Sequence, residues 1–173
     1  MPSANAYAIF TVDPGVTTGC ASALIDTGQP TVAAAMRRAR GKGLLWTWEE
    51  TGSHTEQAWS ICKKATDFFF KYHVEKQYIR ANRALFVIED FQLRQMGVDL
   101  MPVRIQASIE TLLYGAYGSD FEDDEFYTKQ QPSHAKGFCT DRMLKSWNLW
   151  HHLSPHQRDA ARHLAKKVDR LLG

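Results

Sequence analysis

Two acidic residues stand at the ends of apolar segments that are typical of buried β-strands. Asp13 follows the apolar run 7–12 and precedes a Pro-Gly pair, and Glu89 closes the apolar run 84–89. A carboxylate after several apolar residues is costly to bury unless it is paired or solvated. Ligands collect beyond strand ends in open α/β sheets, so neighbouring strands would bring both carboxylates into one crevice. The competing interpretation of Asp13 is a plain turn.

A second polar pair, His156 and Asp159, lies near the start of a helix predicted over 154–172. Their i, i+3 spacing makes them neighbours on the helix surface. Both lie on the shoulder of its apolar stripe, facing the edge of the sheet, and near the positive end of the helix dipole, which favours a carboxylate. A solvated helix start is the alternative. His163, one turn later, fits either a supporting residue of the site or a core histidine.

Together these residues fit metal-assisted phosphodiester hydrolysis. Mg²⁺ prefers oxygen ligands from carboxylates, phosphate and water. Two such ions roughly 4 Å apart can activate a water and stabilise the departing oxygen in one displacement. Three carboxylates and a polar fourth group, brought from three elements, are enough to hold that pair of ions.

These residues need a scaffold in which strands precede and then alternate with helices. Apolar periodicity predicts strands at 7–12, 20–25, 31–35, 44–48, 84–89 and 125–130. Helical spacing and capping boxes predict helices at about 55–77, from Pro102 to 116, a short one within 140–150, and 154–172. The pattern predicts one domain over 1–173: an α/β fold with a mixed central sheet of about five strands and helices on both faces.

Composition narrows the class of protein. The chain has 173 residues, net charge +2 and three well-separated cysteines, so neither a disulfide framework nor a zinc site is indicated. No apolar stretch approaches the ~20 residues of a membrane span. A cytoplasmic location and no membrane partner are the default expectations. An acidic run at 120–125 has no assigned role.

Three motifs in this order resemble the RuvC-type Holliday junction resolvases, and especially their shorter phage-encoded relatives: "TVDPGVTTGCASAL", "FVIEDF" and "HQRDAARHL". The resemblance covers nearly the whole chain. It implies an RNase H-like fold and a homodimer that places two active sites on branched DNA, in a bacterial or phage-infected cytosol. It further implies two Mg²⁺ ions per site, replaceable by Mn²⁺, with no other small-molecule cofactor; the implied metal ligands are Asp13, Glu89, Asp159 and His156.

Several other residues are candidates for DNA contact. The densest basic cluster is suited to phosphates, although a solvated hairpin tip explains it equally; it comprises Arg37, Arg38, Arg40 and Lys42. Phe91 and Arg94 lie in the segment where RuvC-like enzymes probe the junction; Phe91 fits a stacking wedge or a core residue. Three lysines resemble those near the scissile phosphate in the family, with Lys136 also a catalytic candidate: Lys129, Lys136 and Lys145.

Three other functions are also compatible with the sequence. A nuclease of the same fold could act on forks, flaps or RNA, as in the YqgF group. "DPGVTTG" also fits the phosphate loop of actin-like and sugar-kinase ATPases, which need a second domain and a second glycine-rich loop. A junction-binding protein with a degenerate site is the non-enzymatic alternative, disfavoured because all four polar positions hold competent residues.

Overall fold

We analysed a computed structural model that describes residues 6–74, 83–91, 99–118 and 126–173. Its elements in chain order are β1 (Ala6–Asp13), β2 (Thr18–Asp26), α1 (Val32–Gly41), β3 (Leu45–Glu50), α2 (His54–Phe69), the π-helical turn η1 (Phe70–Val74), β4 (Arg83–Glu89), α3 (Met101–Tyr117), β5 (Tyr127–Gln130), α4 (Pro132–Phe138), α5 (Asp141–Ser146) and α6 (Pro155–Leu172).

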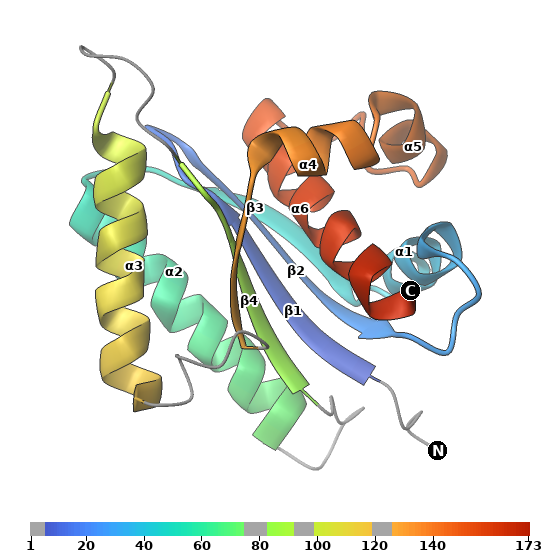
Figure 1. The fold of residues 1–173 in the computed structure, drawn as a ribbon, viewed down its shortest axis with the longest axis horizontal. Coiled ribbons are helices and arrows are strands. Elements are labelled where there is room, and N and C mark those ends of the chain that lie inside the picture. The colour runs from blue at the N-terminus through green and yellow to red at the C-terminus, as the bar shows by residue number, and fades with distance from the viewer. Residues whose placement is uncertain (1–5, 75–82, 92–98, 119–125) are drawn as a thin grey trace.

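The strands form one mixed five-stranded sheet in the order β3-β2-β1-β4-β5. β1 pairs antiparallel with β2 and parallel with β4, and β4 pairs parallel with β5. Helices α2 and α3 cover one face of the sheet, and α1 and α6, with α4 and α5 beside them, cover the other (Figure 1). The predicted mixed sheet with helices on both faces is therefore confirmed.

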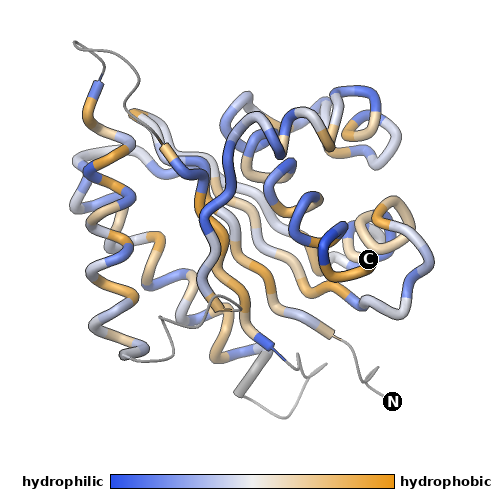
Figure 2. Tube along the Cα trace, in the orientation of Figure 1, coloured by the Kyte–Doolittle hydropathy of each residue, from blue (hydrophilic) through white to orange (hydrophobic). Residues whose placement is uncertain are grey.

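Alternation along β1 divides the core into two layers. Ile9 faces α6 and the small helices, whereas Phe10 and Val12 face α2 and α3. Period-2 alternation with both faces buried produces the nearly continuous apolar run that the sequence shows. Figure 2 shows these hydrophobic residues following the central strands. β1 is thereby held rigidly on both sides up to Asp13.

The strand predicted at 31–35 is wrong: these residues begin helix α1. Thr31 is the N-cap, and its side chain accepts a hydrogen bond from the Ala34 backbone N–H. The alanines that follow have the highest helix propensity, and Ala35, Met36 and Ala39 turn inward. The β-branched Thr31 and Val32 favoured a strand, but Thr31 is equally suited to an N-cap.

The other helices agree with the sequence to different degrees. The predicted capping boxes are present at α2, between Ser53 and Glu56, and at α6, between Ser154 and Gln157. Residues 75–77 of the predicted 55–77 helix lie outside the described residues. Helix α4 was not predicted. In the described part of the chain, no helix is long and apolar enough to cross a membrane.

Candidate active site

The two strand-end acids meet at one edge of the sheet. β1 and β4 are parallel neighbours with Val12 opposite Ile88, so Asp13 and Glu89 come next on adjacent strands. Asp13 is 7% exposed and Glu89 is 8% exposed, and a side-chain hydrogen bond joins the two carboxyl groups. Burial, the charge of Glu89 and the charge of Asp159 together raise the pKa of Asp13 to about 9. These like-charged groups are the part of the site that a divalent cation would relieve most.

Helix α6 is brought onto this edge by a close backbone approach. A Cβ on Gly19 would lie 2.1 Å from the backbone oxygen of His156. Gly19 pairs with Asp13 in the register of β1 and β2, but the tighter constraint on this position comes from the start of α6. One turn further, the Thr11 hydroxyl donates to the Ala160 backbone oxygen at 2.8 Å. The sequence thus places the first turns of α6 against the ends of β1 and β2.

His156 and Asp159 of α6 face the strand-end acids Asp13 and Glu89, as their spacing in the helix predicted. His156 Nδ1 lies 3.6 Å from an Asp13 carboxylate oxygen, and its side chain is 44% exposed. That separation is longer than a hydrogen bond, so His156 is a neighbour of Asp13 and is not fixed by it. Asp159 is close enough for its charge to raise the pKa of Asp13. All four residues implied as metal ligands therefore come together.

Asp159 is held by two cations. Lys136 Nζ donates to one carboxylate oxygen at 2.9 Å, and the Arg162 guanidinium donates to the other. Arg162 also contacts the Asp141 carboxylate and donates to the Cys139 backbone oxygen at 3.1 Å. Partial burial acts to lower the pKa of Lys136, but the hydrogen bond and charge of Asp159 outweigh it and raise that pKa. Lys136 is thus placed at the site from helix α4.

A cavity of about 360 Å³ opens beside Asp159. Its lining includes Lys136, Arg158 and Arg162 together with the acid Asp141. Arg158 donates to the Trp150 backbone oxygen, and its guanidinium lies 3.8 Å from the Trp150 ring centroid. This rigid cation next to the acids is suited to a phosphate group. Sequence reasoning did not single out Arg158 and Arg162, although both lie within the quoted motif "HQRDAARHL"; their positions one residue before and three residues after Asp159 were the available signal.

The side-chain contacts bear directly on whether the site fits a metal. In the ranges 6–74, 83–91, 99–118 and 126–173, no three or more His, Cys, Asp and Glu side chains are already arranged to hold an ion. Two of the candidate ligands are bonded to other side chains: Asp159 to Lys136 and Arg162, and Glu89 to His163. The oxygen-rich donors fit Mg²⁺, provided that Asp159 exchanges its cations for the metal.

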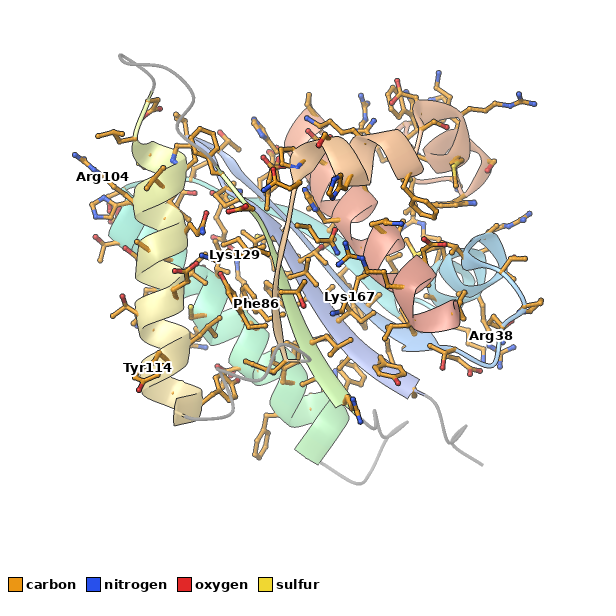
Figure 3. All side chains as sticks on the ribbon, viewed as in Figure 1. Arg38, Phe86, Arg104, Tyr114, Lys129 and Lys167 are labelled. Atoms are coloured by element: carbon orange, nitrogen blue, oxygen red, sulfur yellow. The ribbon has the colours of Figure 1, made fainter. Side chains whose placement is uncertain are left out.

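The residues predicted to contact DNA divide into those near the site and those away from it. Arg38 on α1 lies 3.8 Å from Asp26, which pairs with Ala6 at the other end of β1. Seven residues of strand separate that end from Asp13, or about 23 Å. Figure 3 shows Arg38 at this distant end. The basic cluster is therefore helical rather than a hairpin tip, and is not brought to the acids; it comprises Arg37, Arg38, Arg40 and Lys42, the last being the C-cap of α1.

Lys129 lies away from the acids, whereas Lys145 contacts Trp150, a residue that lines the cavity beside Asp159. Lys129 Nζ pairs with Glu110 at 2.8 Å, which places it on the α3 side of the sheet (Figure 3). Strand alternation gives the opposite, α6-facing side of β5 to Thr128 and Gln130. Lys145 on α5 lies 4.9 Å from the Trp150 ring centroid.

Phe91 follows β4 and is half-buried, with its backbone N–H donating to the Gln106 side chain at 3.4 Å. It is therefore next to Glu89 in the chain but anchored toward α3. Asp90 contacts the Gln131 side chain rather than the cluster of acids. Arg94 lies outside the described residues.

Comparison with protein-family models finds no match, and neither does comparison with curated protein sequences. Solved structures that share the fold include the following two. The structure titled Thermus thermophilus RuvC in complex with Holliday junction substrate aligns at a TM-score of 0.56 and 12% identity, covering 92% of this chain and 91% of that one. A second Thermus thermophilus RuvC structure aligns at a TM-score of 0.52 and 14% identity, covering 92% of each chain.

These alignments define the fold class as RNase H-like, in the form that RuvC adopts. The RNase H-like fold predicted from the three motifs is therefore confirmed. The phage-encoded branch of the family stays a prediction.

Proposed function

We propose that this protein is a metal-dependent endonuclease that hydrolyses phosphodiester bonds in branched DNA, with four-way junctions as its preferred substrate. The observation that carries this proposal is the buried Asp13–Glu89 pair at the ends of adjacent parallel strands, with Asp159 and His156 of α6 facing it. The likeness of fold to a RuvC structure in complex with Holliday junction substrate supports the choice of DNA class.

The chain's own groups have separate tasks in this mechanism. Asp13 and Glu89 would hold Mg²⁺ with Asp159 and His156, and the bound metal would supply an activated water and charge stabilisation. If Asp159 held the metal, its hydrogen bond with Lys136 would be released. The Lys136 ammonium would then lie beside the acids with a donor free for a scissile phosphate, where it would stabilise negative charge that develops in the transition state.

DNA approach is supported by the arrangement of charge around the acids. Lys136, Arg158 and Arg162 line the cavity next to Asp159. Cations placed beside a carboxylate site offset the repulsion between its acids and a polyanionic backbone. Arg158 and Arg162 therefore join Lys136 as proposed phosphate contacts.

A homodimer completes the proposal, because resolution of a four-way junction requires two cuts. Large apolar side chains are exposed along α2, η1 and α3 in a single chain, namely Trp59, Phe70, Leu112 and Tyr114. A second copy packed against them would remove this apolar surface from water. Size-exclusion chromatography with light scattering tests this: a mass of one chain at micromolar concentration would contradict the dimer.

A side-by-side digest tests substrate choice. Synthetic four-way junction, fork, flap, linear duplex and RNA–DNA hybrid are incubated with Mg²⁺ or Mn²⁺, and the products are mapped. Symmetric paired nicks in the junction support a resolvase, whereas unpaired nicks at any branch support a general branched-DNA nuclease.

The variant Asp13→Asn is expected to abolish cleavage while junction binding persists, because one metal ligand is lost and the cations remain. Asp67→Asn, an exposed acid on α2, is the matched control and is expected to cleave normally. Normal cleavage by Asp13→Asn would contradict the assignment.

A further inference from the structure

His163 contacts the site from inside the core. It lies one helical turn after Asp159 on α6 and is 1% exposed. Its Nε2 is 2.9 Å from a Glu89 carboxylate oxygen, and its Nδ1 is 3.1 Å from the Gln130 side-chain oxygen. α6 thus reaches Glu89 on β4 and Gln130 on β5 through a single imidazole.

The position of His163 in α6 is otherwise apolar. Its neighbours Ala160, Leu164 and Ala165 are fully buried and pack in the core between α6 and the sheet. A leucine would satisfy packing at such a position without the cost of burying two polar nitrogens. Core packing alone therefore does not account for a histidine here, whereas its contact with Glu89 does.

The protonation of the two groups decides which one donates the hydrogen bond between His163 and Glu89. A metal-binding Glu89 is a carboxylate and can only accept hydrogen bonds, so His163 Nε2 must be the donor. On the other side, Gln130 presents its oxygen to Nδ1, while the Gln130 amide nitrogen is buried with no hydrogen-bond partner among the described residues. Turning this amide by 180° would let its nitrogen donate to Nδ1. In either orientation Gln130 fixes the plane of the ring, and Nε2 points at Glu89.

Glu89 needs such a restraint because it faces another acid. Asp13 and Glu89 are buried together and share a hydrogen bond while Asp13 keeps its proton. As metal ligands both would be ionised, that bond would be lost, and repulsion between the two carboxylates would favour rotation of one side chain away from the other. A donor on the far side of Glu89 opposes that rotation. The imidazole supplies it from a helix that is itself fixed to β1 by the bond between Thr11 and the Ala160 backbone.

We propose that His163, oriented by Gln130, is a positioning residue that holds the Glu89 carboxylate in its metal-binding orientation beside Asp13. This inference rests on the proposed function and deepens it. The imidazole does not touch the substrate in this role. It acts as an outer partner of a metal ligand, and loss of such partners typically lowers metal affinity by roughly 10- to 100-fold.

The test compares His163→Leu with His163→Gln. Leucine keeps the packing volume but removes the donor, whereas the Gln amide nitrogen can reach the position of Nε2. Mn²⁺ affinity is measured by isothermal titration calorimetry without DNA, alongside junction affinity without metal and the cleavage rate. We expect His163→Leu to weaken Mn²⁺ binding by about 10- to 100-fold, with His163→Gln restoring most of it. Junction affinity should stay within about twofold of wild type, because the cations that bind phosphate are unchanged.

His151→Leu makes the same exchange at an exposed histidine and should match wild type in every assay. A purely structural role would instead lower the melting temperature, metal affinity and junction affinity together, and His163→Gln would rescue none of them; that result overturns the inference. So does wild-type Mn²⁺ affinity in a folded His163→Leu protein. If the wild type itself neither binds Mn²⁺ nor cleaves a junction, the proposed function fails and the inference falls with it. If the wild type cleaves the junction and His163→Leu binds Mn²⁺ as tightly as wild type, only this inference is refuted and the proposed function stands.

Discussion

Replacing Asp13 by asparagine should change how stability depends on pH when no metal is present. The folded pKa of Asp13 is raised from 3.8 to about 9 by burial and by Glu89 and Asp159. Unfolded Asp13 releases its proton near pH 4, while the folded protein keeps it, so the unfolded state binds fewer protons between these values. Stability from this group is therefore fully present below pH 4 and is lost as the pH rises toward 9.

The magnitude of this pH dependence follows from a difference of one bound proton between the folded and unfolded states. A difference of one bound proton changes the unfolding free energy by about 1.4 kcal/mol per pH unit. From pH 6 to pH 8, wild type should lose about 2.7 kcal/mol that Asp13→Asn does not lose. Urea unfolding in EDTA, followed by tryptophan fluorescence at both pH values, measures this difference directly. Asp67→Asn removes an exposed acid and should keep the wild-type slope.

Added Mg²⁺ provides the second half of the test. Bound at about 100 times its Kd, it should stabilise wild type by about 2.7 kcal/mol and stabilise Asp13→Asn much less, because a ligand is missing. Equal loss of stability between pH 6 and pH 8 in wild type and Asp13→Asn would refute the reasoning. It would mean that Asp13 is not a buried acid facing Glu89 in solution.

Two further variants test the placement of individual residues. Lys136→Ala should lower the rate of junction cleavage, timed under single-turnover conditions, by about 100-fold or more, which is the usual cost of removing one stabilising donor. Lys129 lies on the opposite face of the sheet, so the cleavage rate of Lys129→Ala should stay within about twofold of wild type. Gly19→Ala should destabilise the protein by about 4 kcal/mol or more in urea unfolding, because the added Cβ would overlap the His156 backbone oxygen. That backbone cannot move aside without shifting α6. A melting temperature within a degree of wild type would contradict this close approach.

The part of the site that local sequence patterns predicted is the part built from strand ends and helix starts. Asp13 and Glu89 are marked by the apolar runs before them, and His156 and Asp159 by the capping box that begins α6. Such signals need only a few neighbouring residues. They marked the individual side chains, whereas the expectation that Asp13 and Glu89 share one crevice depended on their strands being neighbours, and the full set of ligands came from the family resemblance.

The residues that sequence reasoning misplaced depend on long-range packing. Lys129 and Gln130 are adjacent on a short strand, and only the pairing of β5 with β4 decides which one faces α6. The cluster around Arg38 was expected between two strands; instead it lies on α1, which packs on the α6 side of the sheet near the end of β2 that is far from Asp13. His163 carried a weak signal through its i+4 spacing from Asp159, but its partner Gln130 lies 33 residues away in sequence. No local pattern encodes that contact.

The bond between Thr11 and the Ala160 backbone joins residues 149 positions apart, and this separation has a consequence during synthesis. At about 5–20 residues per second, β1 leaves the ribosome roughly 7–30 s before the α6 segment that completes the cluster of acids. A nascent chain therefore carries Asp13 and Glu89 without Asp159 while residues 90–158 are being made. On the proposed function, the cell is protected from a partly made nuclease, because cleavage becomes possible only after α6 has been synthesised.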